Sequence, residues 1–197
     1  VIFKALNEAS LKVEDGDVLV IAQKVISKAE GRLVKLKDVT PSEEANTLAS
    51  ETDKDPRLVQ LILEESTQVV RKKQGVMIVR HKLGHVGANA GIDQSNIEHS
   101  KEGSALLLPV SPDTSALRLR KYFKKRCGLS IGVIISDSMN RPWRMGSVGE
   151  TIGSSGLAVL DDRRGETDMY GRELKITLIN QADALSSIAT LAMGETC

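Results

Sequence analysis

The feature that most restricts the fold of this chain is a series of short, largely apolar runs, several of them rich in β-branched residues. They occupy residues 18–22, 76–79, 105–108, 131–135, 157–160 and 174–179. Apolar runs of this length, bounded by turn residues, are typical of buried strands. Helical stretches separate them at irregular intervals, without a repeated βαβ period. The pattern therefore predicts an α+β fold of mixed sheets with flanking helices, and not a doubly wound Rossmann sheet.

The helical stretches carry start and stop signals of their own. Thr40 stands where an N-cap residue would, Pro41 would take the first helical position, and Glu43 follows three residues after the cap. Gly128 and Gly194 stand where two later helices should end. The remaining helices are expected over residues 1–13, from residue 56 onward, over residues 111–126 and over residues 183–193.

The length and the ends of the chain set its domain organisation. With 197 residues, 41% of them apolar, the chain can bury a core of its own. No linker or low-complexity stretch marks a boundary, so the sequence predicts one domain over residues 1–197, with two intertwined subdomains as the alternative. The chain opens inside a helical pattern and stops soon after Gly194, and both ends are therefore expected to be truncated.

Charge and cysteine content exclude several classes of protein. Lys and Arg number 27 and Asp and Glu 26, so net charge favours neither nucleic acid nor an anionic membrane as a partner. No apolar run is long enough to cross a bilayer. The two cysteines, Cys127 and Cys197, form no C-x-x-C pair, which excludes a disulfide framework and fits a reducing, cytoplasmic compartment.

The first polar cluster is Asn-Ala-Gly-Ile-Asp-Gln-Ser-Asn at residues 89–96. Magnesium and manganese prefer oxygen ligands, and magnesium sites commonly use one or two carboxylates together with substrate phosphates. Asp93 is a candidate for such a ligand, and Asn96 for a hydrogen bond to a nucleotide. The alternative is an ordinary polar turn, because Asn, Asp, Ser and Gly are all favoured in turns.

The second cluster follows the apolar run 131–135, where Ser136, Asp137 and Ser138 come next. A buried strand would deliver a carboxylate and a hydroxyl to its carboxyl end, the edge where α/β sheets tend to bind ligands. An acid followed by a hydroxyl is a workable magnesium pair. The alternative is that Asp137 and Ser138 only open the next turn.

Two further loops are candidates for binding substrate. Arg141 and Arg144 flank Trp143, the only tryptophan, and suit a phosphate or carboxylate on an aromatic molecule, although Arg packed on Trp is also common at surfaces. Residues 161–173 interleave acids and bases around Tyr170 and Arg172. That stretch is read either as a substrate-binding loop or as a solvated loop of salt bridges.

Several motifs are absent or weak. The sequence has no G-x-x-x-x-G-K-[ST] P-loop and no G-x-G-x-x-G dinucleotide motif. His81 and His85 fall across a strand and a turn, so they need not share a face and are not expected to form a zinc pair. The basic run over residues 118–126 is read first as the solvated face of a helix.

Five stretches, in the same order, resemble the family of coenzyme F-420-0:L-glutamate ligases, the γ-glutamyl ligases of deazaflavin biosynthesis. The resemblance runs over most of the chain. It is carried by residues 25–32, residues 89–96, residues 134–137 with 141–144, residues 168–174 and residues 193–195.

The resemblance implies a homodimeric enzyme with a family-specific α+β fold, which uses GTP and two Mg²⁺ or Mn²⁺ ions per site to join L-glutamate to F-420-0 through an acyl phosphate. The implied ligands of the first metal are Asp93 and Asp137, and those of the second are Ser138 and Glu195. The implied GTP contacts are Gln23, Lys24, Lys28 and Asn96. The implied substrate contacts are Arg141, Arg144, Tyr170 and Arg172.

The chain departs from the family pattern at a few positions. Ser138 stands where members of the family usually have Thr, a change that keeps the hydroxyl, and Met139-Asn140 alters the following loop. Only two residues follow Glu195, so the natural protein is expected to continue past Cys197. The altered loop leaves open a related ligase with another acid or amino acid as substrate. The missing ends leave open a non-catalytic protein that binds nucleotide or metal.

Overall fold

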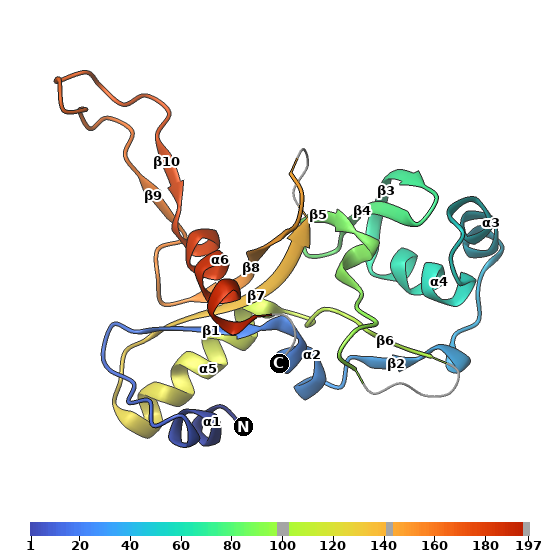
Figure 1. Ribbon diagram of the computed structural model, residues 1–197, viewed down its shortest axis with the longest axis horizontal. Coiled ribbons are helices and arrows are strands. Elements are labelled where there is room, and N and C mark those ends of the chain that lie inside the picture. The colour runs from blue at the N-terminus through green and yellow to red at the C-terminus, as the bar shows by residue number, and fades with distance from the viewer. Residues whose placement is uncertain (98–102, 141–143, 195–197) are drawn as a thin grey trace. The chain divides into compact units, whose positions relative to one another are not determined.

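A computed structural model describes residues 1–97, 103–140 and 144–194 of the chain. Helices and short sheets are mixed along it, so the α+β class expected from the sequence is confirmed (Figure 1). The chain divides into two compact units, each built from separate stretches. The first comprises Val1–Ile21, Pro112–Ser136 and Gly149–Cys197, and the second comprises Ala22–Ser111 and Asp137–Val148. In the described ranges, no helix has both the length and the apolar character needed to span a membrane.

The first unit is built on a sheet with strand order β1 (Val18–Ala22), β7 (Gly132–Asn140) and β8 (Ser147–Ser155). Its helices are α1 (Ile2–Glu8), α5 (Pro112–Cys127) and α6 (Gln181–Met193). The apolar start of β7 is fully buried, as a central strand requires. The boundary between the two units falls within β7.

Strand β8 packs closely against helices because two of its residues lack a side chain. A Cβ added to Gly149 would overlap Ser186 and Thr190 of α6, and one added to Gly153 would overlap Pro112 at the start of α5. Between the two glycines, the Thr151 amide donates to the Asp183 carboxylate at 2.8 Å. Glycine in a strand commonly marks such a close approach of another backbone.

A two-stranded arm also belongs to the first unit. Strands β9 (Leu160–Asp162) and β10 (Leu178–Asn180) pair antiparallel, with Leu178 opposite Asp162, and residues 163–177 connect them. In Figure 1 the arm extends away from α6. Its connecting loop carries Met169, Tyr170 and Ile176, each about nine-tenths exposed.

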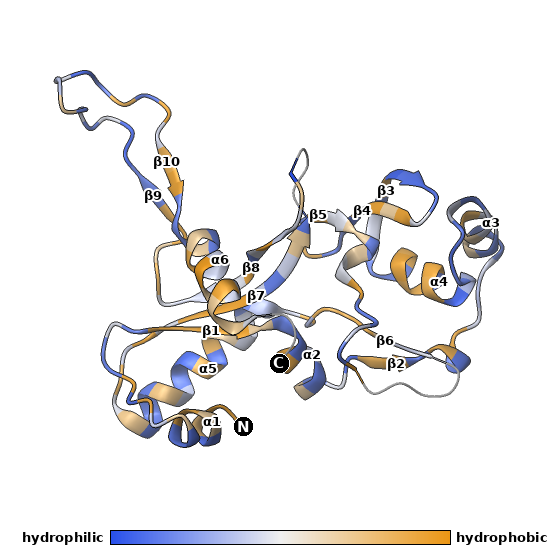
Figure 2. Cartoon of the chain, in the orientation of Figure 1, coloured by the Kyte–Doolittle hydropathy of each residue, from blue (hydrophilic) through white to orange (hydrophobic). Residues whose placement is uncertain are grey.

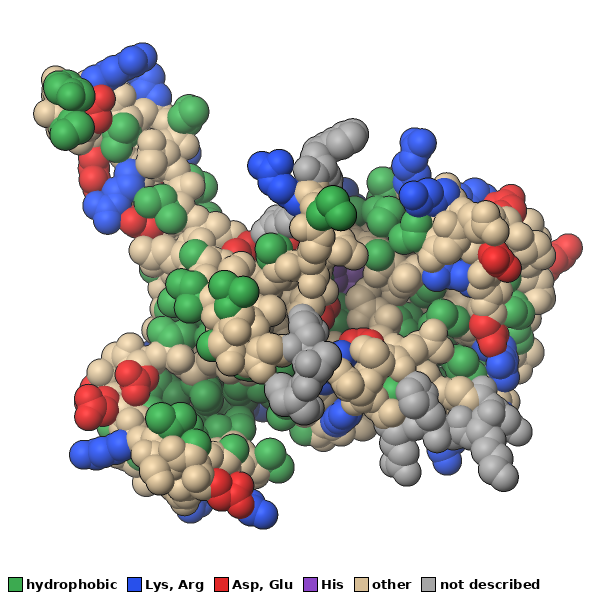
Figure 3. All heavy atoms as spheres, viewed as in Figure 1, with side chains coloured by type: hydrophobic (Ala, Val, Ile, Leu, Met, Phe, Trp, Pro, Cys, Tyr) green, Lys and Arg blue, Asp and Glu red, His purple; other side chains and the backbone are tan. Residues whose placement is uncertain are grey.

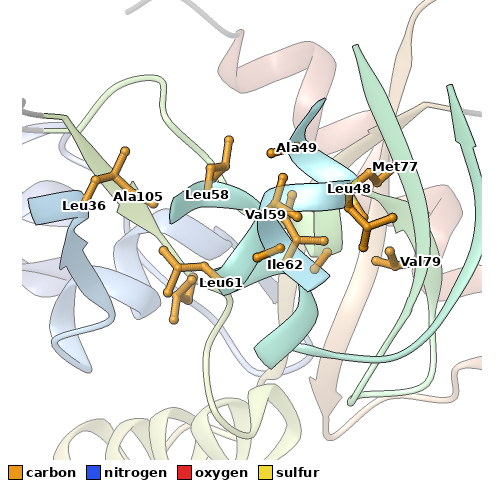
Figure 4. Close-up of a cluster of buried hydrophobic side chains, with 13 residues drawn as sticks. Leu36, Leu48, Ala49, Leu58, Val59, Leu61, Ile62, Met77, Val79 and Ala105 are labelled. Carbon is orange, nitrogen blue, oxygen red and sulfur yellow. The ribbon is translucent and has the colours of Figure 1, made fainter. Parts of the chain in front are cut away.

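The second unit has a helical layer over a small meander. Helices α3 (Glu43–Thr52) and α4 (Pro56–Glu64) pack on the antiparallel strands β3 (Ser66–Lys73), β4 (Val76–His81) and β5 (Val86–Ala88). Figure 4 shows their shared core, in which Leu48, Val59, Ile62, Met77 and Val79 point toward one another. Much of α4 is hydrophobic in Figure 2, and its apolar residues Leu58, Val59, Leu61 and Ile62 are buried.

The rest of the second unit supports the candidate site. Strand β2 (Leu33–Lys35) pairs antiparallel with β6 (Ser104–Leu106). Helix α2 (Gln23–Ala29) precedes β2 in the chain, and the short 3-10 turns η1 (Leu36–Asp38) and η2 (Asn89–Gly91) complete the unit.

The helices differ from the predictions at three places. The first helix ends at Glu8 and does not continue to Val13. The N-cap of α3 is Ser42, whose hydroxyl accepts from the Ala45 amide at 3.2 Å, so the helix begins after Thr40 and Pro41. Ser42 is the residue whose side chain reaches the unpaired amide of the first turn. Helix α2 was not expected, because it follows β1 directly and its N-cap, Ala22, makes no side-chain cap.

The strand boundaries also differ. The prediction for β1 is confirmed at both ends. Strand β7 extends to Asn140, so Asp137 and Ser138 lie within the strand and not in a turn after it. The strand predicted at residues 157–160 is wrong, because β8 ends at Ser155 and β9 begins only at Leu160. The strand predicted at residues 174–179 is wrong over most of its length, because β10 begins at Leu178.

Candidate functional site

Helix α2 presents two lysines to the segment that carries Asp93. Lys24 and Lys28 are four residues apart and therefore lie on the same side of the helix. The Lys24 ammonium is 2.6 Å from Asp93 Oδ2 and donates to Ser95 Oγ at 3.2 Å. The Lys28 ammonium donates to the main-chain carbonyl of Asn96 at 2.8 Å. The structure thus brings together Lys24, Lys28, Asp93 and Asn96, four candidate residues that come from two stretches far apart along the chain.

The backbone ahead of Asp93 is tightly constrained. Asn89, Ala90 and Gly91 have φ values of 52, 55 and 63°, in the left-handed region that is unfavourable for residues with a Cβ. The Asn89 side chain accepts from the Met77 amide at 3.3 Å. A Cβ on Gly91 would lie 2.9 Å from Leu108. Contacts of this kind hold a turn that residues with a Cβ seldom adopt.

Asp93 itself is held by main chain and side chain together. Its amide and carbonyl both bond to Leu106, at 3.0 and 2.8 Å, and Leu106 is fully buried. Asp93 Oδ1 accepts from the Ser95 amide at 2.8 Å and from the Ser95 hydroxyl at 2.7 Å. A carboxylate fixed in this way is preorganised for binding.

The protonation state of Asp93 follows from these contacts. Burial raises the pKa of Asp93, but the hydrogen bonds from Lys24 and Ser95 and the charge of Lys24 outweigh it, so the pKa lies below its usual value. Asp93 is therefore ionised near neutral pH. An ionised, half-buried carboxylate is a suitable oxygen ligand for a hard cation such as Mg²⁺ or Mn²⁺.

Asp137 and Ser138 belong to the same unit, near the end of β7. Asp137 is half-buried and accepts from the Ser138 amide at 2.9 Å, while Ser138 is exposed. Side chains alternate along a strand, so the two point to opposite faces. The sulfur of Met139 lies 3.8 Å from the position of a Cβ on Gly87, which places this end of β7 against β5.

The metal assignment stays a prediction at several points. Within the described ranges, no three side chains among His, Cys, Asp and Glu gather closely enough to hold a metal. Glu195, an expected ligand, lies outside those ranges. The donor chemistry of Asp93 and Asp137 nevertheless fits a hard cation that also takes oxygens from phosphate.

Gln23 fits a nucleotide contact for a different reason. Its side chain is buried, with 2% exposure, and its Oε1 accepts from the Ser27 hydroxyl at 2.8 Å. Its Nε2 makes no hydrogen bond to any described residue. A buried donor without an acceptor costs on the order of 1–3 kcal/mol, so an acceptor supplied by a ligand would stabilise the site.

The remaining expected residues are distributed across the chain. Arg144 is exposed in the second unit, and Arg141 lies outside the described residues. Tyr170 and Arg172 lie in the arm of the first unit, where their amides both donate to Asp168 Oδ1 at 2.9 Å. Their roles toward substrate stay predictions.

Exposed salt bridges connect neighbouring residues at the start of the arm. This agrees with the interpretation of the stretch as a solvated, salt-bridged loop, which the sequence allowed beside that of a substrate-binding loop. Arg163 pairs with Asp161 at 2.9 Å, and Arg164 pairs with Asp162 at 2.5 Å. The hydrogen bonds from Arg164 lower the pKa of Asp162 to about 2. These pairs are exposed, so they shape the loop more than they stabilise the fold.

Sequence reasoning missed a buried cluster around His81. The His81 and His85 rings stack with centroids 4.8 Å apart, so the two side chains do share a face. His81 is 3% exposed, its Nδ1 accepts from the Leu83 amide, and its Nε2 is 3.7 Å from Glu65 Oε2. Glu65 also pairs with Arg32 at 2.5 Å, and His81 and Arg32 together lower the pKa of Glu65. The i, i+4 histidine spacing was the only signal.

Comparisons with known proteins agree across the whole chain. The model of a family described as F420-0:Gamma-glutamyl ligase matches residues 1–197. A coenzyme F420:L-glutamate ligase of Methanopyrus kandleri is 48% identical over 186 residues, covering 94% of this chain and 73% of that protein. Proteins with the same name are 46% identical in Methanocaldococcus jannaschii, over 95% of this chain and 74% of theirs, and 45% identical in Archaeoglobus fulgidus, over 96% and 75%.

Proposed function

Because the chain belongs to the F420-0:Gamma-glutamyl ligase family, we propose that it joins L-glutamate to coenzyme F-420-0 with GTP and divalent metal. The names of the relatives support the substrate class. The observation that carries the proposal is the docking of Lys24 and Lys28 of α2 on the segment of Asp93, Ser95 and Asn96. This arrangement combines cations for phosphate with an oxygen ligand for a metal.

The proposed reaction has two steps. A terminal carboxylate of F-420-0 takes the γ-phosphoryl group of GTP and becomes an acyl phosphate, and GDP leaves. The amine of glutamate then attacks the acyl carbon, an amide forms, and inorganic phosphate and a proton are released. Such chemistry needs positioning and charge stabilisation, and no Ser or Cys nucleophile.

The residues of the second unit supply those needs. Lys24 and Lys28 would bind phosphate oxygens, and Gln23 would donate its free amide hydrogen to the nucleotide. Asp93 and Asp137 would hold one divalent cation, and Ser138 would serve a second one. When bound, these ions would neutralise the negative charge on the phosphoryl group during transfer.

The direct test is product formation. Purified protein is incubated with F-420-0, GTP, Mn²⁺ and L-glutamate, and the products are identified by mass spectrometry. A product heavier by one glutamyl residue, formed together with GDP and absent with Asp93→Asn, supports the proposal. GTP turnover without any glutamylated product contradicts it and favours a non-catalytic nucleotide-binding protein. Ligation of a different acid or amino acid in a substrate panel favours the related-ligase alternative.

The arm is our reason to propose a homodimer. An isolated two-stranded ribbon is marginally stable in water, and this one exposes Met169, Tyr170 and Ile176 almost completely. Figure 3 shows hydrophobic side chains along the arm and at its tip. A second copy that covers them would stabilise the arm. The double variant Met169→Ser, Ile176→Ser should sediment as a monomer where the unmodified protein is a dimer. An unmodified protein that is monomeric at high concentration would contradict the proposal.

A further inference from the structure

We propose that Lys24 is a displaceable counter-ion of Asp93, which competes with a divalent cation for the carboxylate and transfers to nucleotide phosphate when both ligands bind. The proposal rests on the proposed function, in which Asp93 holds metal and α2 faces the nucleotide. It concerns how those two ligands affect each other's binding. The two lysines of α2 would then have different tasks.

The contacts of Asp93 lead to this competition. Oδ1 already accepts two hydrogen bonds from Ser95, and Oδ2 lies 2.6 Å from the Lys24 ammonium. Both side chains of the ion pair are about one-quarter exposed, so water screens the charges only in part. A divalent cation that binds Oδ2 must therefore compete with the Lys24 ammonium for the same oxygen.

Lys24 is able to move to a new partner. Its ammonium is a compact charge on a flexible four-carbon stem, and phosphate is a common ligand of lysine. Its second contact, to Ser95 Oγ at 3.2 Å, is longer than the contact to Asp93. Once phosphate oxygens take the ammonium, Oδ2 becomes available to the metal.

Lys28 provides the contrast. Its ammonium donates to the carbonyl of Asn96, a neutral acceptor, and it comes from the same side of the same helix as Lys24. Without nucleotide, Lys28 therefore holds the segment through a neutral acceptor and does not occupy an oxygen of Asp93, whereas Lys24 neutralises the Asp93 carboxylate. By thermodynamic linkage, exchange of Lys24 makes metal and nucleotide each tighten the binding of the other.

The test measures Mn²⁺ binding without nucleotide, from the electron paramagnetic resonance signal of free Mn²⁺. Lys24→Met should bind Mn²⁺ about tenfold more tightly than the unmodified protein, within the usual range of coupling between sites. Lys28→Met, which removes the same charge one turn away, should change the affinity much less. Lys24→Arg, which keeps the charge, should restore the weaker binding. With saturating Mn²⁺, Lys24→Met should bind GTP more weakly.

Three results would decide against the proposal. If Lys24→Met binds Mn²⁺ no more tightly than the unmodified protein, the competition does not exist. If Lys24→Met and Lys28→Met tighten binding equally, the effect is one of general charge. If Asp93→Asn binds Mn²⁺ as well as the unmodified protein, Asp93 is not a metal ligand, and the metal assignment of the proposed function fails as well. Circular dichroism of each variant shows whether the fold is kept.

Discussion

The imidazole rings of His81 and His85 lie parallel to within 5°, with their centroids 4.8 Å apart. Burial, together with the charge of the neighbouring His81, lowers the pKa of His85 to about 4. The free imidazole of an unfolded chain has a pKa near 6.5, so between these two values the unfolded chain binds a proton that the folded protein does not. The folded state therefore loses stability as the pH falls from about 6.5 to about 4.

We expect His85→Gln to lose less stability over that interval than the unmodified protein. The measurement is the urea midpoint of unfolding at several pH values between 7 and 4.5. The pKa values of Asp93 and Glu65 lie below those of ordinary carboxyls. Their protonation therefore lowers the stability of the fold mainly at the acid end of the interval, and it does so equally in the variant and in the unmodified protein. Parallel curves for the two proteins would show that His85 does not cause the loss.

Gly149→Ala should destabilise the first unit, because its methyl group would overlap the main chain of Ser186. Overpacking of this kind costs about 1–3 kcal/mol, and backbone on the other side cannot give way easily. The measurement is the free energy of unfolding in urea. Gly87→Ala is the matched control, since its methyl group would meet only Met139 at an ordinary 3.8 Å. Equal stability of the two variants would contradict the close approach of β8 and α6.

Lys28→Met should raise the Michaelis constant for GTP about tenfold and change the turnover number less. A lysine that binds phosphate equally in the ground state and the transition state contributes to binding more than to rate. Steady-state kinetics with varied GTP check this, with Lys35→Met, a lysine of β2, as the control. An unchanged Michaelis constant would show that Lys28 does not bind the nucleotide.

Asp93→Asn should reduce ligation by about 10²-fold or more, since loss of one preorganised charge-stabilising group has an effect of that order. The fold should persist, because the main-chain bonds to Leu106 do not involve the carboxylate. Product yield by mass spectrometry and the melting temperature are measured on the same sample. Full activity in the variant would end the role of Asp93, while an unfolded variant would show that its role is structural.

The sequence predicted the parts of the fold that depend on local burial. The run at β1 and the helix at α5 were confirmed because apolar pattern and end signals agree there. Strand β8 was not predicted, because Gly149 and Gly153 are residues typical of loops. Their role in the strand is to let α6 and the start of α5 approach closely, and that contact is visible only in the fold. The residue pattern of a short segment does not indicate which distant part of the chain packs against it.

The candidate site divides in the same way. The resemblance to a family named Asp93, Lys24 and Lys28, but the ion pair between Lys24 and Asp93 needs the fold of the second unit to exist. The left-handed turn begins at Asn89 and Ala90, which both carry a Cβ, and reaches a glycine only at Gly91, so it could not be expected from the residue types. The free amide of Gln23 appears only when burial is known.

The spacing of contacts along β8 limits how this protein can change over evolution. Gly149, Thr151 and Gly153 lie on one face of the strand, and each meets a helix: the first two meet α6 and the third meets the start of α5. A one-residue insertion between them would turn the later residues to the opposite face. Length variation is therefore expected to be absent from β8 and to accumulate in residues 163–177 of the arm, where the backbone lies in solvent.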